Sequence, residues 1–200
     1  MHLVISGDIY KLVNCFSRLP GMGYRSAVRL VVYLLRKKHT ALKYLIDVLG
    51  RVYDSSVVCE VCGNIDVSSI CSICSDSKRD SSTICVIPGI ADLWSIERTG
   101  FYKGKYHVLG GKLSAVNGVL PSDLNISGLY KRISEGEVSE IIMAMSADID
   151  GQATAFFIND KIKDLGVRVT TLSHGVPVGG ELEYLDDGTI IAALKQRHDI

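Results

Sequence analysis

Residues 59–74, CEVCGNIDVSSICSIC, contain two Cys-x-x-Cys pairs separated by eight residues. Zinc in structural sites takes four ligands at tetrahedral corners, and each Cys-x-x-Cys turn can supply two thiolates while its backbone amides bond the sulfurs. The pattern therefore predicts structural zinc, with two redox-active dithiols or a pair of disulfides as the alternatives. A closed four-sulfur site has no open position for a substrate, which indicates a role in folding rather than in catalysis. The predicted ligands are Cys59, Cys62, Cys71 and Cys74.

The composition is that of a globular protein without net charge. The 200 residues include 22 Lys and Arg and 22 Asp and Glu, so a polyanion would have to bind at a local basic patch. The first ten residues lack the basic start of a signal peptide, and no stretch reaches the roughly eighteen apolar residues of a membrane span. We therefore expect a cytoplasmic protein without a membrane partner, in which cysteines stay reduced. Cys15 and Cys85 stand alone and are expected in the core.

The second informative stretch is LPGMGYRSAVRLVVYLL, residues 19–35. Apolar residues repeat at helical spacing on both sides of its Leu-Pro-Gly-Met-Gly segment. Pro20 cannot continue a helix, while Gly21 and Gly23 permit left-handed backbone, so the sequence predicts two helices joined by a tight turn. This arrangement resembles the helix-hairpin-helix motif.

The predicted turn has the properties of a contact site for a nucleic-acid backbone. Its two glycines let the main chain approach a phosphate, and the free amides at the start of the following helix point toward such an anion. Arg25 and Arg29 are four residues apart and so share one face of that helix. We expect sequence-independent, salt-sensitive DNA binding, and the alternative is a plain helical hairpin with two solvated arginines. A third helix is expected to follow Thr40 and to end before Gly50.

From residue 83 onward, β-rich runs alternate with helical patterns, which predicts a mostly parallel sheet covered on both faces. The loop SADIDGQAT, residues 146–154, follows one of these strands and places Asp148 and Asp150 where a binding site is expected. Two carboxylates there could share Mg²⁺, or they could serve as turn and helix-capping groups. The strands are expected at residues 83–87, 106–109, 141–145 and 167–172, and the helices at residues 92–97 and 152–165.

The chain as a whole resembles one family, the bacterial recombination mediators called RecR. The resemblance rests on LPGMGYRSAVRL, CEVCGNIDVSSICSIC, IERTGFYKGKYHVLGGKLS and LSHGVPVGGELEYLDDGT, and it extends from about residue 8 to residue 195. It implies an α+β fold of several modules: a helix-hairpin-helix domain, a four-cysteine zinc finger, an α/β Toprim domain with a parallel sheet, and a C-terminal Walker B-like tail with subunit contacts. The corresponding boundaries are residues 1–54, 55–80, 81–176 and 177–200.

The resemblance also implies a function. Family members are non-enzymatic DNA-repair proteins that work with RecO and RecF to load RecA onto single-stranded gaps coated by SSB. They bind single- and double-stranded DNA and assemble as dimers or as ring-like tetramers that can encircle it. Carried over by position, Arg25 and Arg29 match the basic DNA-contacting residues of the hairpin, and the four cysteines match the zinc ligands.

The sequence departs from the family pattern at the Toprim site. Pro88 stands where the first strand of the family runs into a glutamate, and proline offers neither a ligand nor a proton. Asp150 falls at a family glutamate, Gln152 replaces another, and Ser146 replaces Asn or Asp. These changes weaken the expectation of Mg²⁺ at Asp148 and Asp150. The alternative function is a Toprim-type enzyme that catalyses metal-dependent phosphoryl transfer on DNA, for which two-metal chemistry would need several convergent carboxylates.

The glycine-rich and acidic tail offers interface candidates rather than catalysts. Glu181 and Glu183 are polar residues of the Walker B-like segment, and His174 is expected to form local hydrogen bonds. The chain contains no Walker A pattern, so a self-contained ATPase is not expected.

Overall fold

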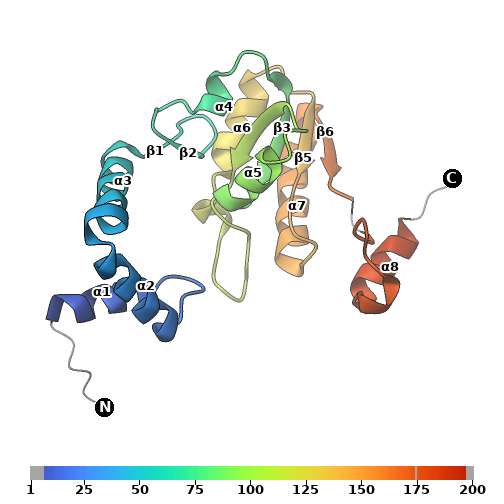
Figure 1. The fold of residues 1–200 in the computed structure, drawn as a ribbon. Coiled ribbons are helices and arrows are strands. Elements are labelled where there is room, and N and C mark those ends of the chain that lie inside the picture. Colours follow the sequence, from blue (N-terminus) through green and yellow to red (C-terminus); the bar gives the residue numbers. More distant parts are fainter. Residues whose placement is uncertain (1–6, 174, 197–200) are drawn as a thin grey trace. The chain divides into compact units, whose positions relative to one another are not determined.

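The structure is a computed structural model that describes residues 7–173 and 175–196. The chain divides into two compact units, with the boundary between residues 56 and 57. The expected order of modules is confirmed: helices come first, then a four-cysteine module, and then a parallel sheet with its helices (Figure 1).

The first unit is helical. Its small core contains Val13, Ala27 and Val31, against which partly buried residues such as Phe16 and Met22 pack. This core joins the first two helices and confirms the predicted helical hairpin. The elements are α1 (Gly7–Ser17), α2 (Tyr24–Arg36), a π-helical turn (Lys38–Leu42) and α3 (Lys43–Ser55).

Three expectations for this unit are wrong. The third helix continues through Gly50 to Ser55, and Thr40 lies within the π-helical turn rather than capping α3. A single glycine in a helix costs only about 1 kcal/mol, so the flanking residues carry the helix through it. Cys15 is exposed on α1 instead of lying in the core, whereas Cys85 is buried as expected.

The second unit begins with the four-cysteine module. Strands β1 (Val57–Val58) and β2 (Ile65–Asp66) pair antiparallel around the first Cys-x-x-Cys turn. The second turn forms the short helix α4 (Ser72–Ser75), which begins after Cys71. Asp66 on β2 links the strand after the first turn to the start of α4. Its carboxylate accepts hydrogen bonds from the backbone N–H and the hydroxyl of Ser72 at 2.8 and 3.1 Å.

The rest of the second unit is built on a four-stranded sheet. Its strand order is β4-β3-β5-β6, and every neighbouring pair is parallel, which confirms the predicted parallel sheet. Cys85, Tyr106 and Ile142 lie side by side on the three strands at one end of this order. The strands are β3 (Asp80–Ile87), β4 (Gly104–Val108), β5 (Glu140–Met143) and β6 (Arg168–Thr171).

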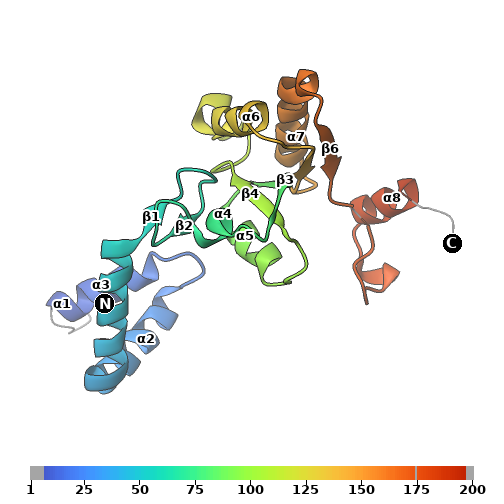
Figure 2. The ribbon, with the colours of Figure 1, turned by 90° about the horizontal axis from the view of Figure 1, so that it is seen from above.

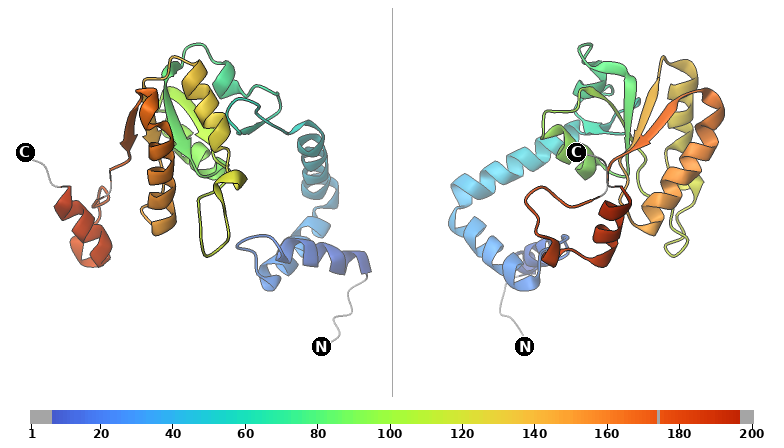
Figure 3. Two further views of the ribbon diagram at one scale, coloured as in Figure 1. Left: turned by 180° about the vertical axis from the view of Figure 1, so that it is seen from behind. Right: turned by 90° about the vertical axis from the view of Figure 1, so that its right-hand side faces the viewer.

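Helices cover both faces of the sheet, as Figures 2 and 3 show. On one face, α6 (Ile126–Glu135) and α7 (Ile149–Ile162) pack against β3 and β5 through a core that includes Leu129 and Ile158. On the other face, α5 (Ile90–Glu97) packs through Leu93 against Tyr106 and Ile87. Helix α6 was not expected from the sequence, although Ile126, Leu129 and Ile133 repeat at helical spacing and are buried.

The tail also contains a helix that was not expected, α8 (Asp187–Lys195). Asp186 caps it by accepting a hydrogen bond from the backbone N–H of Thr189 at 3.0 Å. A short 3₁₀ turn, Leu182–Tyr184, precedes it and contains Glu183. His174, for which we expected a local hydrogen-bonding role, lies outside the described residues. Within the two ranges that the structure describes, no helix is long and apolar enough to cross a bilayer.

Candidate metal centre and nucleic-acid interface

The two Cys-x-x-Cys turns bring their four sulfur atoms together. The Sγ atoms of Cys59, Cys62, Cys71 and Cys74 all lie within 4.8 Å of one another, and those of Cys62 and Cys71 are 3.6 Å apart. Zinc–sulfur bonds of about 2.3 Å in a tetrahedron place neighbouring sulfurs about 3.8 Å apart. The cluster therefore has the size and the donor set of a four-thiolate zinc site.

The surroundings of the sulfurs also suit thiolates. The backbone N–H groups of Cys71 and Cys74 donate to the sulfurs of Cys59 and Cys71 at 3.3 and 3.4 Å. Burial raises the pKa of the Cys59 thiol, but such backbone hydrogen bonds outweigh it and bring the pKa down to about 7. The hydrogen bond with Cys74 and burial both raise the pKa of Cys62. Neighbouring sulfurs thus resist joint ionisation, and a divalent cation among them would relieve that repulsion.

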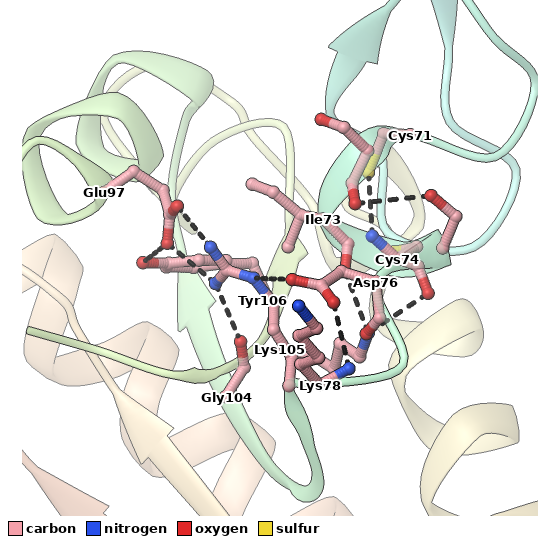
Figure 4. Close-up of polar contacts among 12 residues, drawn as sticks. Cys71, Ile73, Cys74, Asp76, Lys78, Glu97, Gly104, Lys105 and Tyr106 are labelled. Atoms are coloured by element: carbon pink, nitrogen blue, oxygen red, sulfur yellow. Dashed lines mark hydrogen bonds and ion pairs between the residues drawn. The ribbon is translucent and has the colours of Figure 1, made fainter. Parts of the chain in front are cut away.

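The cysteine module is attached to the sheet through strand β4. The N–H of Val108 donates to the carbonyl of Cys62 at 2.8 Å. Gly63 follows with φ +77°, and a Cβ atom there would lie 3.1 Å from the carbonyl oxygen of Val108, so a larger residue would be both strained and crowded. The ammonium of Lys105 donates to three backbone carbonyls around α4, those of Ile73, Cys74 and Asp76, at 2.7–3.1 Å (Figure 4).

A second polar link joins the segment after the cysteines to the sheet. Arg79 forms a two-pronged ion pair with Glu97 at the end of α5, with N···O distances of 2.9 and 2.6 Å. The buried Tyr106 donates its hydroxyl to the same carboxylate at 2.8 Å (Figure 4). Burial raises the pKa of Glu97, but the hydrogen bonds from Arg79 and Tyr106 outweigh it and lower the pKa overall. These contacts fix the cysteine module and the sheet as neighbours within one unit.

The helical hairpin in the first unit exposes the predicted DNA-contacting residues. Gly21 has φ +75°, and Gly23 is the N-cap of α2 without a side chain to cap the helix. A Cβ atom at either glycine would meet no other atom within 4 Å, so the backbone there is open to a ligand. Arg25 and Arg29 are exposed, and neither forms an ion pair with another residue in the described part of the chain.

The edge of the sheet that holds the candidate Mg²⁺ ligands Asp148 and Asp150 is organised differently from a metal site. Asp148 caps α7 by accepting a hydrogen bond from the N–H of Gly151 at 2.7 Å. Its other oxygen pairs with Lys112 at 2.6 Å, and Lys112 also donates to the hydroxyl of Ser146 at 2.9 Å. The hydrogen bond from Lys112, followed by that from Gly151, lowers the pKa of Asp148 to about 2. A lysine ammonium thus already neutralises Asp148.

The other expected components of that site add no further ligands. Asp150 lies in the first turn of α7, and Pro88 directly follows β3. Within residues 7–173 and 175–196, the four cysteines are the only group of three or more His, Cys, Asp or Glu side chains placed to hold one ion. The residues at this edge do not fit a magnesium site of several carboxylates.

Four family models match successive parts of the chain. They describe a RecR helix-hairpin-helix at residues 9–52, a RecR four-cysteine zinc finger domain at residues 57–76, a Toprim domain at residues 82–173, and a RecR C-terminal region at residues 175–198.

Full-length relatives give the same assignment. The chain is 47% identical to Recombination protein RecR of Erythrobacter litoralis over 195 residues, which cover 98% of both chains. It is 49% identical to the RecR protein of Parvibaculum lavamentivorans over 194 residues, covering 97% of this chain and 98% of the relative. The identity to the RecR protein of Agrobacterium fabrum is 47% over 197 residues, or 98% of each chain.

The chain belongs to the RecR family. This membership supports a role in DNA recombination and repair, and it identifies the hairpin, the cysteine cluster and the sheet as the helix-hairpin-helix, zinc-finger and Toprim domains of a RecR protein.

The sequence did not predict the lysine and arginine residues that lie beside Asp148 and the cysteine module. Lys112 lies 36 residues before Asp148, and Lys105 lies 31 residues after Cys74. Arg132 belongs to the unexpected helix α6 and donates to the carbonyl of Tyr106 at 2.6 Å. No local pattern marks these residues, because their partners come close only when the parallel strands are assembled.

Proposed function

We propose that this chain is a non-enzymatic, DNA-binding mediator of recombinational repair. It acts in the cytoplasm with RecO and RecF and loads RecA onto single-stranded gaps coated by SSB. The observation that carries DNA binding is the exposed start of α2, with an open glycine backbone beside two exposed arginines. Membership of the RecR family supports the repair role, and the partners are proposed on that basis.

The hairpin suits the sugar-phosphate backbone rather than the bases. The N–H groups of the first turn of a helix are free of intrahelical partners and attract an anion, and the absence of a capping side chain at Gly23 leaves them available. Arg25 and Arg29 project from the same helix and can neutralise adjacent phosphates. Such contacts carry little sequence information, so we propose binding to both single- and double-stranded DNA.

We further propose that the working form is a dimer or a ring-like tetramer. None of the residues of α3 is buried, although the helix carries Tyr44, Ile46, Leu49, Val52 and Tyr53 as exposed large apolar residues. An apolar helix surface of this kind is a candidate for contact with another copy. Assembly also compensates for the zero net charge, because several hairpins in one ring multiply a few phosphate contacts through effective concentration.

Zinc has a structural role in this proposal. Cys59, Cys62, Cys71 and Cys74 would hold it, and the metal would contribute folding free energy to the module that precedes the sheet. We propose domain boundaries at residues 1–54, 55–80, 81–176 and 177–200, with subunit contacts in the last segment.

The competing function, metal-dependent phosphoryl transfer on DNA by the Toprim domain, lacks a suitable site. Asp148 is paired with Lys112, and proline replaces the glutamate expected after β3. We therefore propose that the chain leaves DNA intact in the presence of Mg²⁺. Nicked or cleaved product that accumulates with the wild-type chain and disappears with Asp150→Ala would establish the enzyme instead.

The mediator proposal is tested by RecA loading. Gapped DNA coated with SSB is incubated with RecA, RecO and RecF, and RecA-dependent ATP hydrolysis is followed with and without this chain. We expect the chain to shorten the lag before hydrolysis and the variant Arg25→Ala/Arg29→Ala to restore the lag. Arg36→Ala/Lys37→Ala, which removes the same charge from the far end of α2, is the control and should act like the wild type. An Arg25/Arg29 variant that loads RecA normally would contradict the proposed role of the hairpin.

A further inference from the structure

Two cations from the sheet and its helix lie beside the cysteine cluster. Lys105 on β4 and Arg132 on α6 line one cavity of about 300 Å³, and Cys74 lines the same cavity. Lys105 and Arg132 are both partly buried. The Toprim domain therefore extends two positive charges to the edge of the zinc-finger domain.

Neither cation is paired with a carboxylate in the described part of the chain. Lys105 donates to three backbone carbonyls, and Arg132 donates to the carbonyl of Tyr106 at 2.6 Å and to Nδ1 of His107 at 3.2 Å. All of these acceptors are neutral. Glu135 and Glu137 also line the cavity, but both are exposed, and neither lies within 4.0 Å of either cation. Partly buried cations without an anion are costly, so a negative charge is expected nearby.

Arg132 is held in place by a neutral histidine. His107 is fully buried, and its Nε2 contacts the carbonyl of Asn125 at 2.7 Å, which leaves Nδ1 to accept from Arg132. Burial lowers the pKa of His107 to about 4, so the ring is neutral at physiological pH. These two hydrogen bonds hold the guanidinium at the cavity that Cys74 also lines.

We propose that Lys105 and Arg132 are positioning residues that balance the charge of the zinc centre and tie it to the Toprim sheet. A Zn²⁺ ion with four thiolates has a net charge of −2, and the two side chains supply +2. Lys105 also bonds the carbonyls of Ile73 and Cys74, so it orients the backbone that carries the second cysteine pair. The inference rests on the proposed zinc site, and it assigns zinc affinity to residues outside the zinc-finger domain.

The test measures zinc affinity in the full-length chain by competition with a chromophoric chelator. Partners that surround metal ligands typically change affinity 10- to 100-fold, so we expect Lys105→Met and Arg132→Gln each to weaken zinc binding at least about tenfold. The charge-preserving variants Lys105→Arg and Arg132→Lys should remain within about threefold of the wild type, a smaller loss than the lower end of that range. Lys103→Met removes an exposed cation next to the same strand and should leave the affinity unchanged.

Cobalt substitution supplies a readout that loss of packing alone would not produce. The thiolate-to-Co²⁺ charge-transfer band should move to lower energy in Lys105→Met and Arg132→Gln, because thiolates without a neighbouring cation release an electron more easily. If Arg132→Gln does not fold, Lys105→Met decides, since the acceptors of Lys105 among the described residues are backbone oxygens. A wild-type chain without zinc would overturn the zinc site itself. A zinc-loaded wild type whose neutral variants keep its affinity and its band would overturn only this inference.

Discussion

The helices before residue 56 bury much less apolar surface than the sheet and helices after residue 57. In the first unit, α3 has no buried residue, and its Tyr53 and Tyr44 are 85% and 70% exposed. In the second unit, two apolar clusters line opposite faces of the sheet, and the cysteine cluster is joined to the sheet by hydrogen bonds from β4. The two regions therefore depend on different sources of stability.

The difference in buried apolar surface suggests that the two units contribute differently: the second unit to stability, and the first to contacts with other molecules. The second unit has its own apolar core and a cluster of four cysteines spaced to hold one metal ion. Apolar burial and metal binding are both sources of folding free energy for a domain of this size. The first unit has only a small core and leaves the large apolar residues of α3 exposed, together with Arg25 and Arg29 on α2. We propose that another copy contacts the apolar residues and that DNA contacts the arginines. Mutations in the second unit should act on stability, and mutations in the first unit should act on assembly and on DNA.

The largest expected effect follows loss of a zinc ligand in the second unit. Cys59→Ser should abolish stoichiometric zinc and destabilise the chain by more than about 3 kcal/mol, because structural zinc contributes directly to folding. Zinc content by atomic absorption and unfolding by denaturant would measure both quantities. Cys15→Ser is the matched control, since Cys15 is exposed on α1 and should tolerate the same exchange. Full zinc occupancy in Cys59→Ser would remove Cys59 from the site.

The next largest effect is expected in the core of the sheet unit. Leu129 on α6 is fully buried, so Leu129→Ala should cost about 2–5 kcal/mol in a denaturant titration. The same exchange at Leu49 on α3, which is 57% exposed, should change the stability of the isolated chain little. Leu49→Ala should instead lower the mass found by light scattering, if α3 is a contact between copies. Equal losses of stability at the two positions would remove the contrast between the units.

A smaller effect is expected from the buried histidine. The pKa of His107 is lowered by burial to about 4, so the unfolded chain binds more protons between pH 4 and 6.5. The histidine's contribution to stability is therefore complete above pH 6.5 and is lost as the pH falls toward 4. Between pH 7.5 and 5.0 the loss should be about 2 kcal/mol.

The variant His107→Gln isolates that contribution, because it retains polar contacts without a titrating ring. Denaturant unfolding of both chains at several pH values would show a shallower acid decline in the variant. Identical pH profiles for the wild type and His107→Gln would mean that His107 does not titrate in this window.

Local patterns in the sequence predicted much of the fold. The glycine turn between two apolar repeats predicted the hairpin, and the alternation of strand and helix patterns predicted the parallel sheet. These features depend on residues close together in the chain. Helix α6 was missed although its apolar spacing is regular, because its sequence is flanked by loop-like segments and carries a glycine in its first turn.

The site residues likewise divide into those that local sequence spacing predicts and those that only the folded chain brings together. The four cysteines could be grouped from their spacing, and Arg25 and Arg29 from their separation of one helical turn. The partners of Asp148 and of the cysteine module could not, because Lys112, Lys105 and Arg132 reach them only across assembled strands. Charge balance between distant segments is a property of the folded chain, and no single stretch of sequence displays it.

We propose that the α2 hairpin binds the DNA backbone without reading its sequence. The most direct measurement is the dependence of DNA affinity on salt concentration for the wild type and for Arg25→Ala/Arg29→Ala. Each lost phosphate contact lowers the slope of log K against log salt by about 0.9 on duplex DNA, so the variant should bind more weakly, with a slope smaller by about 2 for each hairpin engaged. An unchanged slope and affinity in the variant would show that Arg25 and Arg29 do not contact the DNA backbone.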